Sequence, residues 1–121
     1  MDSDIFTKIQ NEMSACLFAL GIYPNTVGFS NVINTVICVV KSGNPAYPTC
    51  KAYKDASAIL HKTPSSIERS IREIIIKCEN NNTASKLNAF FGCTVYHGIP
   101  LCAGELISLF AMKYINEINF A

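Results

Sequence analysis

The sequence carries little charge of either sign and has no long apolar run. Charged residues make up 16% of the chain, and ten Lys and Arg against nine Asp and Glu leave a formal net charge of +1. This balance excludes a strong sequence-wide attraction to nucleic acid or acidic membranes, so an anion-binding surface requires local clustering of charge. No apolar run approaches the ~20 residues that cross a bilayer. The acidic start MDSDIFTKIQNEM also lacks the build of a secretory signal, so we expect a cytoplasmic protein without membrane association.

The patterns that carry enzyme chemistry are missing as well. The sequence has no nucleophile elbow, no phosphate-cradling glycine loop and no paired catalytic carboxylates, and its two histidines lack a nearby acid that would complete a triad. We therefore expect neither an enzyme nor a cofactor. The six cysteines form no C-x-x-C spacing, so we expect free thiols that act mostly as small core residues. Cys93, His97 and Cys102 supply only three ligands, and we expect no metal there.

Apolar residues make up half of the chain and recur mostly at helical spacing. The pattern predicts helices over residues 4–20, 28–40, 49–60, 63–80, 83–91 and 103–118. The second segment, with the run VINTVICVV, is β-branched enough for a strand, but its i, i+3, i+4 spacing favours a buried helix. We expect helix caps at Asp2 or Ser3, at Thr49, and at Thr63 with Pro64 following it. The sequence thus predicts one all-α domain of six helices over residues 1–121.

The stretch TPSSIERSIREIIIKC, residues 63–78, contains both arginines of the chain. At about 100° per residue, one side of this helix is apolar and must face the core, and the other side is largely polar. The inner side carries Ile67, Ile71, Ile74, Ile75 and Cys78, and the outer side carries Ser65, Ser66, Arg69, Arg72, Glu73 and Ile76. Together with the shorter preceding helix and a tight turn, this layout predicts a helix-turn-helix over residues 49–80.

The residue types on the outer side suit DNA. The planar fork of arginine binds a guanine edge or a phosphate through two hydrogen bonds, which lysine does not do in the same way. Serine hydroxyls and the free N–H groups of a first helical turn suit phosphate oxygens. A second interpretation stays open, because Glu68 with Arg72 and Arg69 with Glu73 are i, i+4 pairs that make a self-neutralised, solvated helix face. His61 at the turn equally suits a phosphate contact or plain solvation.

Three stretches in the same order carry a family resemblance: ALGIYPNTVGFSNVINTV, TPSSIERSIREIII and LNAFFGCTV. Over nearly the whole chain, the sequence resembles the C-terminal effector domain of the sporulation response regulator of endospore-forming Firmicutes, stage zero sporulation protein A. The resemblance implies a six-helix DNA-binding domain with a helix-turn-helix. It also implies that this domain reads a short heptameric DNA box, often as a homodimer on tandem sites, and contacts RNA polymerase to regulate transcription.

The resemblance also implies roles for individual residues. Arg69 and Arg72 contact base edges or phosphates, and Glu68 orients an arginine or accepts from a cytosine amino group. From the chemistry of their side chains, and not from the resemblance, we expect Lys62, Ser65 and Ser66 to hold the DNA backbone. Glu73 lies on the same predicted DNA-binding face.

The chain departs from the family pattern at several of these positions. Ser66 stands where the family usually has arginine, Glu73 where it has histidine, and Ile76 where it has a charged or polar residue. Residues 96–101 replace a lysine-bearing loop. Because each lost phosphate contact removes electrostatic attraction, we expect weaker DNA binding. The alternative function is a degenerate homologue that acts as a protein-interaction module. Family members carry an N-terminal receiver domain, and with so few residues before the first predicted helix we expect none here.

Overall fold

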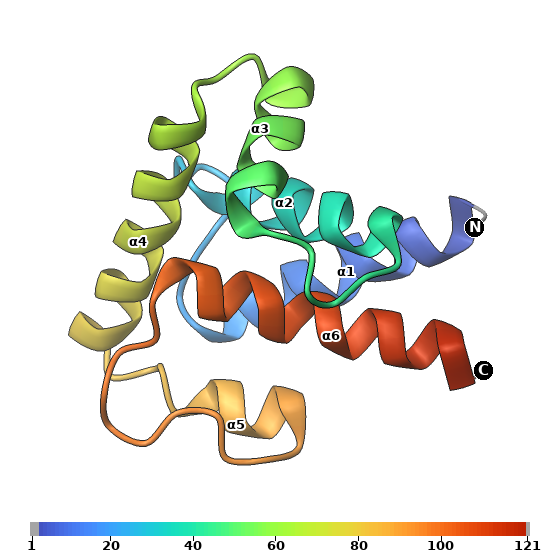
Figure 1. Ribbon diagram of the computed structural model, residues 1–121. Helices are drawn as coiled ribbons and strands as arrows, with labels where there is room; N and C mark the ends of the chain where they lie inside the picture. Colours follow the sequence, from blue (N-terminus) through green and yellow to red (C-terminus); the bar gives the residue numbers. More distant parts are fainter. Residues whose placement is uncertain (1–2, 121) are drawn as a thin grey trace.

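The computed structural model describes residues 3–120, which form six helices (Figure 1). In chain order these are α1 (Ser3–Ala19), α2 (Phe29–Ser42), α3 (Thr49–Leu60), α4 (Pro64–Asn80), α5 (Lys86–Phe91) and α6 (Ala103–Phe120). This part of the chain contains no strand, so the predicted all-α class with six helices is confirmed. Among the described residues, no helix combines the length and apolar character needed to cross a membrane.

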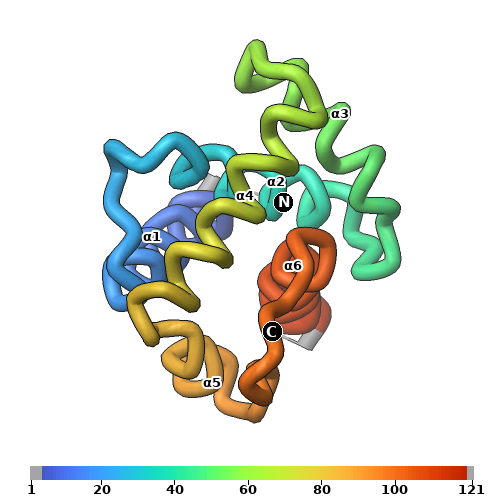
Figure 2. Tube along the Cα trace, turned by 90° about the vertical axis from the view of Figure 1, so that its left-hand side faces the viewer, coloured from blue at the N-terminus to red at the C-terminus, as the bar shows by residue number. Residues whose placement is uncertain are grey.

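Helix α2 lies at the centre of the fold. It packs against α1, α3, α4 and α6 (Figures 1 and 2). Ten of its fourteen residues are buried, and only a narrow polar stripe that includes Ser30, Asn34 and Lys41 reaches solvent. So large a buried surface calls for a nearly continuous apolar run, and this explains why its sequence resembles a buried strand. The structure resolves the ambiguity of residues 28–40 in favour of the helix.

Gly28, which immediately precedes α2, allows α2 and α4 to approach closely. A Cβ atom at this position would lie 2.7 Å from the carbonyl oxygen of Ser70 and 2.7 Å from Cδ1 of Ile74. Its φ is −83°, so the position demands space rather than a left-handed backbone. The missing side chain therefore fixes the start of α2 against the middle of α4.

Helices α5 and α6 close the other end of the molecule around an aromatic cluster. The rings of Phe90, Phe91 and Phe110 have centroid separations of 5.1 to 5.5 Å. Helical spacing over residues 103–118 predicts a core stripe of Leu106, Leu109, Phe110, the stem of Lys113, Tyr114 and Ile118. Helix α6 buries a wider surface than this stripe, because it packs against α2, α3 and α4. Leu109 and Ile118 of that stripe are only partly buried. Its fully or almost fully buried residues are Ala103, Leu106, Ile107, Phe110, Ala111, Tyr114 and Ile115.

One predicted helix cap and one predicted helix start are wrong. Thr49 is the first residue of α3 rather than its cap, because the carbonyl of Pro48 already accepts the N–H of Ala52 at 3.1 Å. The fifth helix begins at Lys86 instead of Thr83, whose hydroxyl donates to the carbonyl of Leu20 at 2.8 Å. Thr83 thus ties a turn to the end of α1. The cap expected at Asp2 or Ser3 concerns side chains outside the described part of the chain.

The cysteines follow the prediction only in part. All six are free thiols. Three of them are core residues and three are exposed, so the expectation that most would be buried is wrong for half of them. The buried ones are Cys16, Cys38 and Cys78, and the exposed ones are Cys50, Cys93 and Cys102.

Candidate nucleic-acid interface

Three residues, His61, Lys62 and Thr63, connect α3 to α4. His61 adopts a left-handed conformation with φ 56°, and its N–H donates to the carbonyl of Ser57 at 2.9 Å. The hydroxyl of Ser57 in turn donates to the carbonyl of Lys62. These bonds hold the connection tight and set the direction in which α4 leaves α3 (Figure 1). The two helices and their short connection lie at the predicted residues.

The start of α4 is capped as the sequence predicts. The Thr63 side chain accepts from the N–H of Ser66 at 3.2 Å, and Pro64 occupies the first helical position. Ser65 and Ser66 are exposed, and the Ser65 hydroxyl lies 3.5 Å from that of Thr63. Because a helix N-terminus carries partial positive charge, these hydroxyls form a polar surface suited to anionic oxygens.

Helix α4 has the two faces that its sequence predicts. The inner residues are buried, except Ile75, which is partly buried. The outer residues are exposed to solvent, namely Ser65, Ser66, Arg69, Arg72, Glu73 and Ile76. Ile76 is 57% exposed, which is high for a large apolar side chain. Both arginines therefore lie on one free face, together with Glu73 and an apolar residue.

The two predicted ion pairs on this face differ. The Nε atom of Arg72 lies 2.7 Å from Oε1 of Glu68. Arg69 and Glu73 make no ion pair in residues 3–120. Arg69 thus presents an uncompensated guanidinium group, whereas Arg72 is held by its neighbour one turn earlier. An exposed pair of this kind contributes about 0.3–0.5 kcal/mol to stability.

A buried tyrosine of α3 lies close to this ion pair. Tyr53 is 8% exposed, and its hydroxyl has no hydrogen-bond partner among the described residues. Burial raises the pKa of Tyr53 to about 12, with a further contribution from the negative charge of Glu68. Lys51 and Lys54, also on α3, are exposed, and the Lys51 ammonium lies 5.8 Å from the ring centroid of Tyr47.

Lys62 belongs to a polar network that the sequence does not reveal. Its Nζ donates to Oδ1 of Asn31 at 3.2 Å, and Nδ2 of Asn31 donates to the hydroxyl of Ser70 at 2.8 Å. Asn31 is fully buried in α2, and Ser70 lies on the inner side of α4. The network therefore joins the α3–α4 turn, α2 and α4. In the sequence Asn31 is only one of several polar residues of α2, so nothing there singles it out.

The remaining candidates do not form a cluster. Among residues 3–120, no group of three or more His, Cys, Asp or Glu side chains is arranged to hold a metal ion. Cys93, His97 and Cys102 are all exposed in or next to the irregular segment before α6. Cys102 instead caps α6, because its Sγ accepts from the N–H of Glu105 at 3.4 Å. In return the N–H of Cys102 donates to Oε1 of Glu105 at 2.9 Å, which lowers the pKa of that carboxyl group.

Comparison with known proteins agrees with this geometry. Residues 13–114 match the family model described as sporulation initiation factor Spo0A C terminal. The chain belongs to this family. The match runs from the C-terminal part of α1 through most of α6 and includes the whole of α3 and α4. No curated protein and no solved structure matches the chain.

Membership in the Spo0A C-terminal family makes this a DNA-binding regulatory domain of the sporulation-regulator type, and not a member of an enzyme family. The three single-residue departures from the family pattern all lie on the outer face of α4, whereas the replaced loop, residues 96–101, lies between α5 and α6. Ser66, Glu73 and Ile76 are exposed, so each changes the surface that α4 presents and none is absorbed into the core.

Proposed function

We propose that this cytoplasmic domain binds double-stranded DNA sequence-specifically, with α3 and α4 as a helix-turn-helix and the first half of α4 in the major groove. Arg69 and Arg72 contact base edges or phosphates, and Glu68 holds Arg72 in a fixed direction. Ser65, Ser66 and Lys62 contact the DNA backbone, and Glu73 limits the affinity on the same face. As in the family it resembles, the domain binds tandem sites as a homodimer and acts on RNA polymerase.

The observation that carries the proposal is the position of the arginines. Both are exposed on one face of α4, within three turns of a capped helix start whose hydroxyls point to solvent. This is the local clustering that a chain with a net charge of +1 needs in order to bind a polyanion. A bidentate arginine–guanine contact gives about 1–3 kcal/mol of discrimination between bases, so two of them suffice for most of a site's specificity.

The test is a titration of the protein against a duplex that carries the family's box and against a scrambled duplex, at two salt concentrations. We expect preferential binding to the box, with affinity that falls as salt rises. Arg69→Ala with Arg72→Ala should abolish both the affinity and the preference. Arg69→Lys with Arg72→Lys is the matched control, because it keeps the charge but removes the fork. It should retain binding to both duplexes and lose the preference.

A second function is favoured by the composition of the same face. Glu73 and the 57% exposed Ile76 give α4 a partly apolar, partly acidic surface, which suits a protein partner better than a phosphate backbone. Negligible affinity for every duplex at low salt would rule out the DNA proposal and leave this one. Equal affinity for the box and the scrambled duplex would leave a nonspecific binder.

A further inference from the structure

Ile76 is an exposed apolar residue on the otherwise polar side of α4. Its side chain is 57% exposed, whereas its neighbours Ile74 and Ile75 are buried and partly buried. A single exposed apolar residue needs no explanation in itself. The position of Ile76 along the helix sets it apart, because it lies in line with Arg69.

Four exposed residues form one stripe along α4, which we call the outer stripe: Arg69, Arg72, Glu73 and Ile76. They follow one another at i, i+3, i+4 and i+7. At about 100° per residue, Ile76 points within about 20° of the direction of Arg69 and lies between the directions of Arg72 and Glu73. Homeodomains read bases in the major groove with four residues of one helix at this same spacing. The outer stripe therefore has the register of a base-reading surface over its whole length.

The length of the outer stripe also matches the spacing of base pairs. A helix rises ~1.5 Å per residue, so Ile76 lies ~10.5 Å beyond Arg69 along α4. Stacked base pairs of B-DNA are ~3.4 Å apart, so this distance covers about three base-pair steps. When Arg69 contacts one base pair of the major groove, Ile76 faces another about three steps away.

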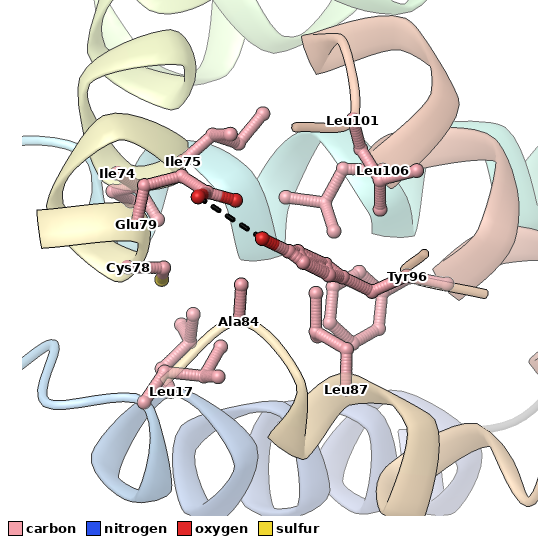
Figure 3. A pocket seen from close by; sticks show the side chains of 12 residues that line it. Leu17, Ile74, Ile75, Cys78, Glu79, Ala84, Leu87, Tyr96, Leu101 and Leu106 are labelled. Atoms are coloured by element: carbon pink, nitrogen blue, oxygen red, sulfur yellow. Dashed lines mark hydrogen bonds between the residues drawn. The ribbon is translucent and has the colours of Figure 1, made fainter. Parts of the chain in front are cut away.

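The second half of α4 is held on its inner side and free on its outer side. Ile74 and Ile75 line a small cavity together with Tyr96, whose hydroxyl donates to Oε2 of Glu79 at 3.0 Å (Figure 3). The other oxygen of Glu79, Oε1, is buried and accepts no hydrogen bond from the described residues. Ile76 is not part of the cavity lining. Figure 2 shows α4 across the front of the molecule, and no other helix of residues 3–120 lies in front of it.

The major groove offers one apolar group that suits an isoleucine. Each base pair presents a distinct set of donors and acceptors there, and thymine adds the methyl group on its C5 atom. Apolar side chains recognise this methyl group. Against the edge of another base, the same side chain would leave donors and acceptors without partners. Thymine is therefore the base that fits the end of the outer stripe.

We propose that Ile76 determines specificity by packing against the C5-methyl group of a thymine, about three base pairs from the base pair that Arg69 contacts. This role rests on the proposed DNA-binding function and extends base reading by one helical turn beyond Arg72. Glu73 is compatible with it, because a carboxylate accepts from the N4 amino group of a cytosine. The departure of Ile76 from the family pattern thus changes which base is read.

The first experiment selects the preferred DNA. A pool of duplexes with a randomised core is incubated with the unaltered chain, with Ile76→Ala and with Ile59→Ala, and the bound duplexes are sequenced. Ile59→Ala is the matched control, because Ile59 is 50% exposed but lies on α3. We expect the unaltered chain and the control to select a core with a fixed thymine. Ile76→Ala should select the same core with that one position relaxed.

The second experiment removes only the methyl group. Each thymine of the selected core is replaced in turn by deoxyuridine, which keeps the base pair but lacks the C5-methyl group, and the Kd is measured by titration. For the unaltered chain, one replacement should weaken binding about fourfold, as the loss of one buried methyl-sized group predicts. For Ile76→Ala the same replacement should change nothing, because the two changes remove the same contact.

The possible failures are distinguishable. If the unaltered chain selects no core, the DNA-binding function is wrong, and the role of Ile76 is wrong with it. A different result is a core that Arg69→Ala with Arg72→Ala no longer selects and at which deoxyuridine has no effect. The DNA-binding function then stands and the role of Ile76 is overturned. An equal deoxyuridine effect in the unaltered chain and in Ile76→Ala would also overturn it, since another residue would then contact the methyl group.

The test does not depend on the folding of one variant. Circular dichroism checks that Ile76→Ala is folded, and the deoxyuridine replacements on the unaltered chain need no variant at all. Ile76→Val keeps a branched apolar side chain at the same position, and it should keep the preference for thymine.

Discussion

Helices α2 and α4 are both rich in β-branched residues, but they differ in how much of their surface is buried. Ten of the fourteen residues of α2 are buried, and the helix contacts four other helices. Helix α4 is buried on one side only, and its other side carries both arginines to solvent. The comparison shows that the core is organised around α2, whereas α4 joins that core to the surface on which the proposed function depends.

The two helices are not independent. Gly28 lets the start of α2 approach the middle of α4, and Asn31 links α2 to Ser70 and to Lys62 in the α3–α4 turn. The orientation of the arginine-bearing face therefore depends on contacts that are made beneath it. Substitutions at the α2–α4 contact, on the inner side of α4 and on its outer side therefore measure the contributions of the core and of the surface separately.

The largest effect is expected inside α4. Ile71 is fully buried, so Ile71→Ala should lower the free energy of unfolding by about 2–5 kcal/mol. Ile76→Ala on the same helix removes the same atoms from a position that is 57% exposed, and should change stability by less than about 0.5 kcal/mol. Urea denaturation of both variants measures the difference. Similar losses would mean that the outer face of α4 is also covered.

The next largest effect concerns the close approach of α2 and α4. Gly28→Ala places a Cβ atom 2.7 Å from Ser70 O and Ile74 Cδ1, and one of the helices must shift. We expect a loss of about 2–3 kcal/mol, at the upper end of the cost of overpacking. Gly43→Ala is a useful contrast, since Gly43 has a φ of 70° and an open environment. Its cost should come from backbone strain alone and should leave α4 undisturbed in amide spectra.

A smaller effect is expected from the polar link. Asn31→Ala removes the donor to Ser70 and the acceptor of Lys62, and should cost about 1–2 kcal/mol. Asn34→Ala, on the same helix, removes only a bond to the carbonyl of Ser30 and should cost less. Thermal unfolding compares the two. If Asn31→Ala were as mild as Asn34→Ala, the network would have no part in holding the turn.

The difference in burial between α2 and α4 also explains which features of the fold could be predicted from the sequence. The faces of α4, its cap at Thr63 and the two arginines were predictable, because one solvated side produces a clear helical period. Helix α2 was ambiguous because most of its residues are buried and many of these are β-branched, which is also typical of a buried strand. The sequence could not predict the structural roles of Asn31, Gly28 and the unpaired oxygen of Glu79, since each role depends on contacts between segments far apart in the chain. Thr83 was misread as a helix start because its hydroxyl bonds to Leu20 and not to its own helix.

The smallest change in stability is expected at Glu68, where the functional consequence is informative. Glu68→Gln breaks the 2.7 Å ion pair with Arg72. Because the pair is partly exposed, the free energy of unfolding should fall by less than about 0.5 kcal/mol. The loss of a negative charge beside the DNA phosphates should raise affinity for the scrambled duplex by roughly two- to fivefold.

Affinity for the box should rise less, because Arg72 is then no longer held in one direction, and the ratio between the two duplexes should fall. Titrations at one fixed salt concentration measure both constants. An equal gain on the two duplexes would show that Glu68 only repels phosphates and does not orient Arg72. A loss of several kcal/mol in the free energy of unfolding would instead show that the ion pair helps to hold the core together. The outer side of α4 would then contribute to stability as its inner side does.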